Sequence, residues 1–176
     1  MSTTEDWQAL VEAQSREQFA AAHPFPFLLA RSTGEAARPA PTVRLDGGPE
    51  LMAAIMAERR RLLASAPADR GLVVLPVRKV QANFPSMITV GRARNNDIVV
   101  ADQLVSKFHA FFRQLDDGGW ALADAGSANG TKIGEVELPP KGQPEPVRSG
   151  DKITFGVSTF RFCDAAGLWA ALHEPR

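Results

Sequence analysis

From Gly71 onward, the chain consists of short apolar runs rich in β-branched residues, and turn residues separate these runs. Residues 72–77 form the first run, and the Asp-Asp-Gly-Gly sequence at 116–119 is a hairpin signal between two later runs. Many short strands at this spacing indicate an antiparallel β-sandwich and not a parallel sheet. We therefore predict a mainly β domain over residues 71–164. Its candidate strands are 73–80, 87–91, 98–99, 108–114, 120–123, 132–133, 153–155 and 159–162.

Residues 1–70 have a different pattern, and we predict an α-helical N-terminal region that includes a proline-rich linker. Apolar side chains at helical spacing predict one helix over residues 4–22, which begins with a capping box at 2–5. This helix should end before Pro24, because the residue that precedes a proline avoids the α region. We expect residues 24–29 to be extended.

Further loops and helices are expected in the rest of the chain. Residues 31–48 lack periodicity and are rich in Pro, Ala and Gly, which indicates a linker. An apolar stripe after this linker predicts a second helix, and Pro67 ends it. Residues 141–147 contain two prolines and are predicted to be a loop. Asp164 can cap a last short helix within the C-terminal segment 165–176.

The composition limits the classes of function. The 176-residue chain carries 20 basic and 20 acidic residues, so no overall field draws it to nucleic acid or to an anionic membrane. Cys163 is the single cysteine, which excludes an intramolecular disulfide and suits a reducing compartment. The three histidines are far apart in the sequence, and no phosphate loop or dinucleotide fingerprint is present, so we expect no metal and no cofactor. No apolar run could span a bilayer or form a signal core, and we expect a cytoplasmic protein.

Polar residues gather where the predicted strands end. Loops at one end of a β-sandwich can converge although they are far apart in sequence. Here the loops would bring together a guanidinium, a hydroxyl, an ammonium and an amide, which suit a phosphate and include no obvious catalytic base. The pattern therefore predicts a binding site. The clusters are Gly91-Arg92, Asn95-Asn96-Asp97, Ser106-Lys107-Phe108-His109 and Asn129-Gly130-Thr131.

In this order, the clusters resemble those of the forkhead-associated (FHA) domain, a β-sandwich that binds phosphothreonine. The resemblance continues in Gly150-Asp151 and in the run Ile153-Thr154-Phe155-Gly156. Each short string is weak alone, but all of them on this strand pattern are specific. The resemblance covers residues 71 to about 164, and it implies an antiparallel FHA-type sandwich.

The resemblance implies that Arg92, Ser106 and Lys107 hold the phosphate and that Asn129 binds the ligand main chain. The chemistry of these residues agrees, because a phosphothreonine carries about −1.5 to −2 charges and three acceptor oxygens. Arg92 offers a planar fork of donors, Ser106 a hydroxyl and Lys107 a second charge. The amide of Asn129 has both a donor and an acceptor for a peptide backbone. The expected supporting residues are Gly91, Asn96, His109, Gly130 and Thr131.

Other roles are open for some of these residues. Arg92 could instead form a structural ion pair with Asp97 or Asp102. Ser106 and His109 could suggest a nucleophile and its base, but no Gly-x-Ser-x-Gly sequence surrounds Ser106. The resemblance implies that His109 is structural and that its ring ties one loop to another.

Two positions depart from the family pattern. Ala128 stands where several FHA domains carry a hydroxyl residue that helps to bind the phosphate. Lys107 occupies a position where family members often have Arg or Asn. Phosphate binding is compatible with both changes, and they bear on affinity and ligand preference.

The leading hypothesis is a non-catalytic phosphothreonine-peptide-binding module in Ser/Thr-kinase signalling. Its partner would be a phosphothreonine-containing protein, such as a Ser/Thr kinase or the substrate of one. The alternative is a phosphate-independent scaffold that uses its helical N-terminal half for contact. We do not expect an enzyme, since the helical half shows no acid/base constellation. Phosphorylation-dependent self-association is a further hypothesis, because four threonines lie outside the sandwich: Thr3, Thr4, Thr33 and Thr42.

Overall fold

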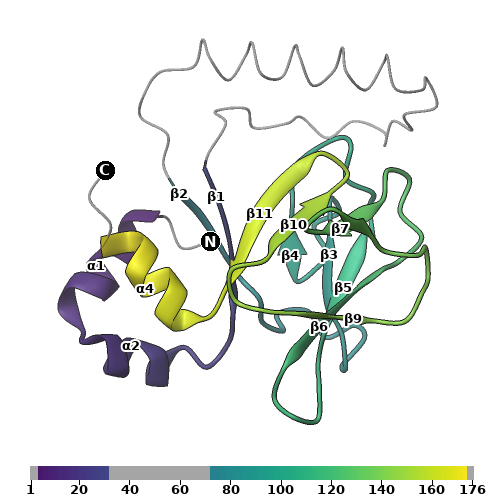
Figure 1. The fold of residues 1–176 in the computed structure, drawn as a ribbon. Helices are drawn as coiled ribbons and strands as arrows, with labels where there is room; N and C mark the ends of the chain where they lie inside the picture. The colour runs from purple at the N-terminus through teal and green to yellow at the C-terminus, as the bar shows by residue number, and fades with distance from the viewer. Residues whose placement is uncertain (1–3, 32–71, 174–176) are drawn as a thin grey trace.

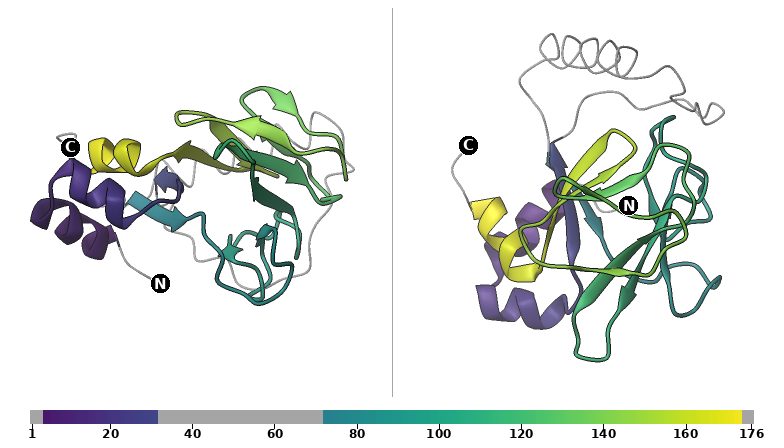
Figure 2. Two further views of the ribbon diagram at one scale, coloured as in Figure 1. Left: turned by 90° about the horizontal axis from the view of Figure 1, so that it is seen from below. Right: turned by 45° about the vertical axis from the view of Figure 1, so that its right-hand side comes forward.

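The structure is a computed structural model that describes residues 4–31 and 72–173. Over these residues the strands form two sheets that face each other (Figure 1). The helices lie together at one side of the sandwich, beside strands β1 (Phe27–Arg31) and β2 (Leu72–Pro76) (Figure 2). The mainly β sandwich that follows N-terminal helices is the fold class predicted from the sequence.

The first sheet combines strands from both ends of the described chain. Its order is β2-β1-β11-β10-β7-β8, and neighbouring strands are antiparallel. The remaining strands of this sheet are β7 (Thr131–Ile133), β8 (Val136–Glu137), β10 (Lys152–Phe155) and β11 (Ser158–Cys163). Because β1 pairs with both β2 and β11, a strand from within residues 1–70 belongs to the sheet. The boundary expected at residue 71 leaves this strand out.

The second sheet has the order β4-β3-β5-β6-β9. Its strands are β3 (Ile88–Gly91), β4 (Ile98–Val99), β5 (Ala110–Gln114), β6 (Trp120–Asp124) and β9 (Glu145–Val147). β3 and β4 run parallel, with Val90 opposite Ile98, which departs from the antiparallel pairing expected. The chain between them is the loop that carries Arg92.

The strand β1 separates two hydrophobic cores. Successive side chains of a strand point to opposite faces. Leu28 therefore packs between the sheets with Phe112 and Phe162, whereas Phe27 and Leu29 pack against the helices. These five side chains are at most 4% exposed. Burying each large apolar side chain contributes about 1.5–3 kcal/mol, so both cores stabilise the position of β1.

The N-terminal helix is interrupted, so the prediction of one helix over residues 4–22 is wrong. The structure has α1 (Thr4–Ala13) and α2 (Arg16–Ala22). Ser15 begins the second helix with a capping box: its hydroxyl accepts from the N–H of Gln18, and its own N–H donates to the Gln18 side chain. The predicted end before Pro24 is confirmed.

A C-terminal helix completes the helical cluster. In α4 (Ala165–His173), the N–H of Gly167 donates to the Asp164 carboxylate at 2.7 Å, as the predicted cap requires. Leu168 is fully buried among side chains of α1, α2 and β1. Cys163 lies in the same cluster, and burial raises the pKa of its thiol to about 12. The thiol is therefore protonated at neutral pH.

Some expectations fail and others fall outside the described residues. The predicted loop 141–147 contains the strand β9, which tolerates Pro146 because it lies at the edge of its sheet. The strand β8 was also not predicted. The linker from residue 32, the helix ending at Pro67 and the capping box at 2–5 lie outside the described residues.

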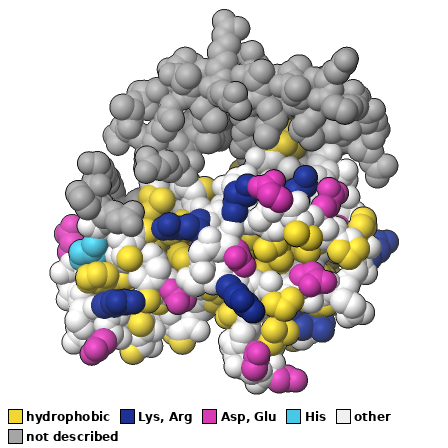
Figure 3. All heavy atoms as spheres, viewed as in Figure 1, with side chains coloured by type: hydrophobic (Ala, Val, Ile, Leu, Met, Phe, Trp, Pro, Cys, Tyr) yellow, Lys and Arg dark blue, Asp and Glu magenta, His cyan; other side chains and the backbone are white. Residues whose placement is uncertain are grey.

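The surface matches the balanced charge of the sequence. Figure 3 shows cationic and anionic side chains interspersed over the face in view. No helix within residues 4–31 and 72–173 has both the length and the apolar character needed to cross a bilayer.

Candidate functional site

The loop after β3 is bound edge to edge to the loop before β5. The backbone N–H of Arg92 donates to the carbonyl of Ser106 at 2.9 Å, and that of Ala93 donates to Lys107 at 3.2 Å. The Arg92 Nε also donates to the carbonyl of Val105 at 3.2 Å. These bonds hold the guanidinium beside the Ser106 loop.

Gly91 is required by this close approach. A Cβ at Gly91 would overlap the carbonyl oxygen of Lys107 and lie 2.9 Å from Nδ2 of Asn96. The buried Asn96 uses Nδ2 to donate to the carbonyls of Ala93 and Lys107, both at 2.7 Å. Asn96 therefore joins the same two loops from inside.

Asp97 fastens a third segment to these loops. Its Oδ1 accepts from the backbone N–H groups of Val80 and Gln81, and its Oδ2 accepts from Thr89 and from the Lys79 ammonium. Burial raises the pKa of Asp97, but the N–H of Gln81, the Lys79 ammonium and the other donors outweigh it and lower the pKa to about 2. The structure thus pairs Asp97 with Lys79 at 2.9 Å.

His109 connects the Ser106 loop to the Gly130 turn. The ring is fully buried, its Nδ1 accepts from the N–H of Ser106 at 2.9 Å, and its Nε2 lies 3.0 Å from the carbonyl of Gly130. Because Nδ1 accepts, the ring proton is on Nε2 and donates to Gly130. Both ring nitrogens are occupied, so His109 does not serve as a base for the Ser106 hydroxyl. It ties loop to loop, as the resemblance implied.

The turn before β7 reaches the same site. The hydroxyl of Ser106 accepts from the N–H of Ala128 at 3.0 Å, which uses an oxygen lone pair and not the hydroxyl hydrogen. Nδ2 of Asn129 donates to the carbonyl of Leu104 at 2.9 Å, which orients the side-chain amide. Arg92, Ser106 and Asn129 are all partly exposed at this end of the sandwich.

Lys107 is the exposed member of the cluster. Its backbone carbonyl is held by the Arg92 loop, while its side chain is on the surface. The structure therefore brings together the loops of all four predicted ligand residues: Arg92, Ser106, Lys107 and Asn129.

The sequence reasoning missed Asp124, which organises the turn of Asn129. The buried carboxylate accepts from the N–H groups of Gly126 and Ser127 at 2.7 and 2.8 Å. It also accepts from the hydroxyls of Ser127 and Thr131, both at 2.6 Å. An Asp two residues before a Gly in a turn region is a recognised turn signal, and it could have been found in the Asp124-Ala-Gly-Ser sequence. Through its bond to Asp124, Thr131 stabilises the turn.

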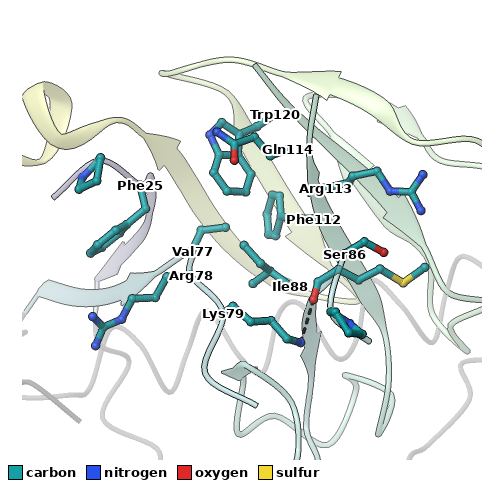
Figure 4. A pocket seen from close by; sticks show the side chains of 13 residues that line it. Phe25, Val77, Arg78, Lys79, Ser86, Ile88, Phe112, Arg113, Gln114 and Trp120 are labelled. Atoms are coloured by element: carbon teal, nitrogen blue, oxygen red, sulfur yellow. Dashed lines mark hydrogen bonds between the residues drawn. The ribbon is translucent and has the colours of Figure 1, made fainter. Parts of the chain in front are cut away.

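A separate hollow lies at the opposite end of the sandwich. It measures about 680 Å³, and Figure 4 shows Phe112, Trp120 and Ile88 around it. Ile88 begins β3, whereas Arg92 follows the end of that strand, so the hollow and the Arg92 loop lie at different ends of β3. Elsewhere among the described residues, no group of three or more metal-ligating side chains lies close enough together to hold an ion.

The loop cluster lies in a part of the chain that matches a known family. The model of the FHA domain matches residues 88–156, which contain Arg92, Ser106, Lys107 and Asn129. The chain belongs to the FHA domain family. FHA domains are known for binding phosphothreonine peptides and are generally non-catalytic binding modules. The comparison with curated proteins found no match.

Several solved structures are similar to this chain. An FHA domain of an Arabidopsis thaliana hypothetical protein is 30% identical, with a TM-score of 0.41 over 52% of this chain and 71% of its own. Mycobacterium tuberculosis EmbR in complex with a low-affinity phosphopeptide is 18% identical, with a TM-score of 0.44 over 68% of this chain and 37% of its own. Full-length yeast Pml1p is 18% identical, with a TM-score of 0.45 over 92% of this chain and 93% of its own.

Proposed function

We propose that this protein is a non-catalytic module that binds phosphothreonine peptides through its FHA domain. Arg92, Ser106 and Lys107 would hold the phosphate, and Asn129 would hold the ligand main chain. The module would act in cytoplasmic Ser/Thr-kinase signalling and recruit phosphorylated partners, such as a kinase or a kinase substrate.

The convergence of the loops around Ser106 is the observation that carries this proposal. The Ser106 carbonyl accepts from the Arg92 N–H, and its hydroxyl accepts from the Ala128 N–H next to Asn129. A guanidinium, a hydroxyl and a side-chain amide are therefore set on neighbouring loops. Because charge-assisted hydrogen bonds are about twice as strong as neutral ones, a phosphate suits this set better than an uncharged group.

The lack of an available base at Ser106 supports a binding role. Both nitrogens of the neighbouring His109 are hydrogen-bonded and the ring is buried. A nucleophilic serine needs a base within hydrogen-bond reach of its hydroxyl. His109 is therefore not available as a base for the Ser106 hydroxyl.

The test is binding of the full chain to a degenerate phosphothreonine peptide library, beside the same library without phosphate. The full chain is needed because β1 lies outside residues 71–164. We expect phosphate-dependent binding that Arg92→Ala weakens more than tenfold, since a hydrogen bond to a charged group contributes about 1.5–3 kcal/mol. Arg92→Lys should be intermediate, because it keeps the charge and loses the planar fork.

Arg113→Ala is the matched control, because Arg113 is exposed on β5 and lines the hollow at the opposite end. It should bind like the wild type. Urea unfolding of each variant separates a lost ligand contact from a lost fold. Equal binding of phosphorylated and unphosphorylated peptides would overturn the proposal and favour the phosphate-independent scaffold.

Phosphorylation-dependent self-association is part of the same proposal. Thr4 and other threonines outside the sandwich supply candidate phosphorylation sites. Size-exclusion chromatography before and after treatment with a Ser/Thr kinase should show a shift that Arg92→Ala removes. An unchanged elution volume would exclude self-association and leave recruitment of a separate partner.

A further inference from the structure

A pair of stacked aromatic rings is exposed beside the proposed phosphate loops. The side chains of Phe84 and Phe108 are 53% and 39% exposed, and their ring centroids are 5.9 Å apart with planes 6° from parallel. Phe111 of β5 continues the stack, 6.5 Å from Phe108. Single exposed apolar residues are ordinary on a protein surface, but grouped ones mark interaction sites. We call Phe84 and Phe108 the aromatic shelf.

The segment that carries Phe84 is anchored by hydrogen bonds to Asp97. The buried carboxylate of Asp97 accepts from the N–H groups of Val80 and Gln81, both at 2.7 Å. Phe84 itself has a φ of +46°, in the left-handed region that is unfavourable for a residue with a large side chain. The Phe84 ring therefore lies at the surface in an unfavourable backbone conformation, with Phe108 as its stacking neighbour. Its position therefore suits contact with a ligand.

The aromatic shelf is continuous with the phosphate loops. Phe108 directly follows Lys107 in the chain. The side chain of Asn83 donates to the carbonyl of Asn95 at 3.1 Å, which joins the segment of Phe84 to the loop of Arg92. Phe108 thus shares a loop with Ser106 and Lys107, and the segment of Phe84 is hydrogen-bonded to the loop of Arg92.

The hydrogen bonds also give an order across this end of the sandwich. Ser106 is bonded to Arg92 through its carbonyl and to Ala128 through its hydroxyl, so it lies between those two loops. Asn129 follows Ala128, whereas the segment of Phe84, whose ring stacks on Phe108, is bonded to the loop of Arg92. Suppose that a peptide binds with its phosphate at Ser106. The part of the peptide on one side of the phosphothreonine would then contact Asn129, and the part on the other side would reach the aromatic shelf.

We propose that the aromatic shelf binds an apolar side chain, aromatic or branched aliphatic, of the same phosphothreonine ligand. That side chain lies on the side of the phosphothreonine away from Asn129. This inference rests on the proposed function of the FHA site. The basic residues Arg92, Arg94 and Lys107 occupy the loops that border the rings. This combination suits a single ligand that carries an anionic group and, beside it, an apolar side chain.

The test is a positional scan with the full chain. Phosphothreonine peptides of otherwise random sequence carry Phe, Leu or Ala at each position from four before to four after the phosphothreonine. We expect one position, on one side, at which Phe and Leu bind about three- to tenfold better than Ala, as for an aromatic contact pair. Phe108→Ala and Phe84→Asn should abolish this preference and keep phosphate-dependent binding. Asn is chosen at residue 84 because it tolerates a positive φ.

Two controls separate this inference from the proposed function. Val136→Ala removes another exposed apolar side chain, 69% exposed on β8, and should leave the preference unchanged. Arg92→Ala should weaken binding of all phosphorylated peptides, with or without the apolar residue. Phosphate-dependent binding without an apolar preference, or a preference that survives both Phe variants, would overturn the shelf alone. Absence of any phosphate-dependent binding would overturn both proposals.

A second copy of the chain could also cover the aromatic shelf, and the test must exclude this occupant. Sedimentation velocity over a concentration series should show a monomer for the unphosphorylated wild type and for Phe84→Asn. A dimer of the wild type that Phe84→Asn dissociates would assign the shelf to a second copy of the chain and overturn the inference.

Discussion

The imidazole of His109 accepts a hydrogen bond from the backbone N–H of Ser106 at 2.9 Å, so a buried ring fixes the peptide unit of a proposed phosphate ligand. The opposite edge of the ring donates to the carbonyl of Gly130. The ring therefore sets the distance between the loop of Ser106 and the turn of Asn129. A binding site built from separate loops depends on such internal connections as much as on the residues that touch the ligand.

Replacing His109 by Ala should destabilise the protein by roughly 3 kcal/mol or more. The change leaves a cavity beside Phe155, and it leaves the N–H of Ser106 and the carbonyl of Gly130 without their partner. Urea unfolding measures the free energy. His173→Ala, at an exposed position, should cost less than about 1 kcal/mol. Equal losses in the two variants would contradict the structural role of His109.

Stability should fall as the pH drops below about 6.5. Burial lowers the pKa of His109 below its ordinary value of 6.5, although the carbonyl of Gly130 and the charges of Asp124 and Asp102 act in the opposite direction. Between the two pKa values, the unfolded chain binds a proton at His109 and the folded chain does not. The free energy of unfolding therefore decreases with falling pH, by up to about 1.4 kcal/mol per pH unit.

The measurement is urea unfolding from pH 7.5 to 5, with His109→Gln as the comparison, because Gln can form hydrogen bonds and does not titrate. The two proteins differ only at residue 109, so the difference between the two curves isolates His109. Parallel curves would show that the pKa of His109 is not lowered in the folded state.

The sequence predicts the sandwich well because its strands are short, alternate and end in turn residues. The strand β1 is harder to predict, since Pro24 and Pro26 precede a short apolar run and its partners β2 and β11 lie far along the chain. The strand β9 is obscured by Pro146, which is acceptable only because the strand is at an edge. Ser15 and Gln18 form a capping box between the two helices. Apolar residues at helical spacing lie on both sides of this capping box, so periodicity alone predicts one helix.

The candidate site also has parts that the sequence predicts and parts that it does not. Its ligand residues form short motifs that can be recognised in the sequence, such as Gly91-Arg92. Its internal supports depend on contacts between distant segments: Asp97 binds the N–H groups of Val80 and Gln81. No local pattern predicts which carboxylate receives which amide, and only the folded chain shows that Asp97 anchors the segment of the exposed Phe84.

Asp97→Asn should destabilise the protein by about 2–4 kcal/mol at neutral pH, because an Asn amide cannot accept all the hydrogen bonds that the carboxylate accepts. The pKa of Asp97 is about 2 in the folded protein against an ordinary value of 3.8. The stabilisation by its charge is therefore present above pH 3.8 and is lost as the pH falls toward 2.

Asp116→Asn is the control for this change, since Asp116 is exposed in the hairpin after β5. Thermal unfolding between pH 2 and 5 should show a steeper acid loss in the wild type than in Asp97→Asn. The same acid loss in both proteins would assign it to other carboxylates.

Gly91→Ala should remove phosphopeptide binding together with stability. The added Cβ would overlap the backbone carbonyl of Lys107, which cannot move without breaking the bonds of Asn96 and Ala93 to that oxygen. Because the overlap is with backbone, the two loops must separate, and we expect a loss of about 1–3 kcal/mol in unfolding free energy. Displacement of Arg92 relative to Ser106 should also weaken phosphopeptide affinity by about tenfold or more, since a shift near 1 Å disrupts paired charge-assisted bonds.

Gly119→Ala is the matched control, because the nearest atom to its added Cβ is the end of the flexible Asp117 side chain, at 2.9 Å. This variant should unfold and bind like the wild type within about 0.5 kcal/mol. Urea unfolding and peptide titration on both variants test the two effects separately. If Gly91→Ala lost stability and kept full phosphopeptide affinity, the spacing of the two loops would not matter for the ligand, and the phosphate would have to be held by Ser106 and Lys107 without Arg92.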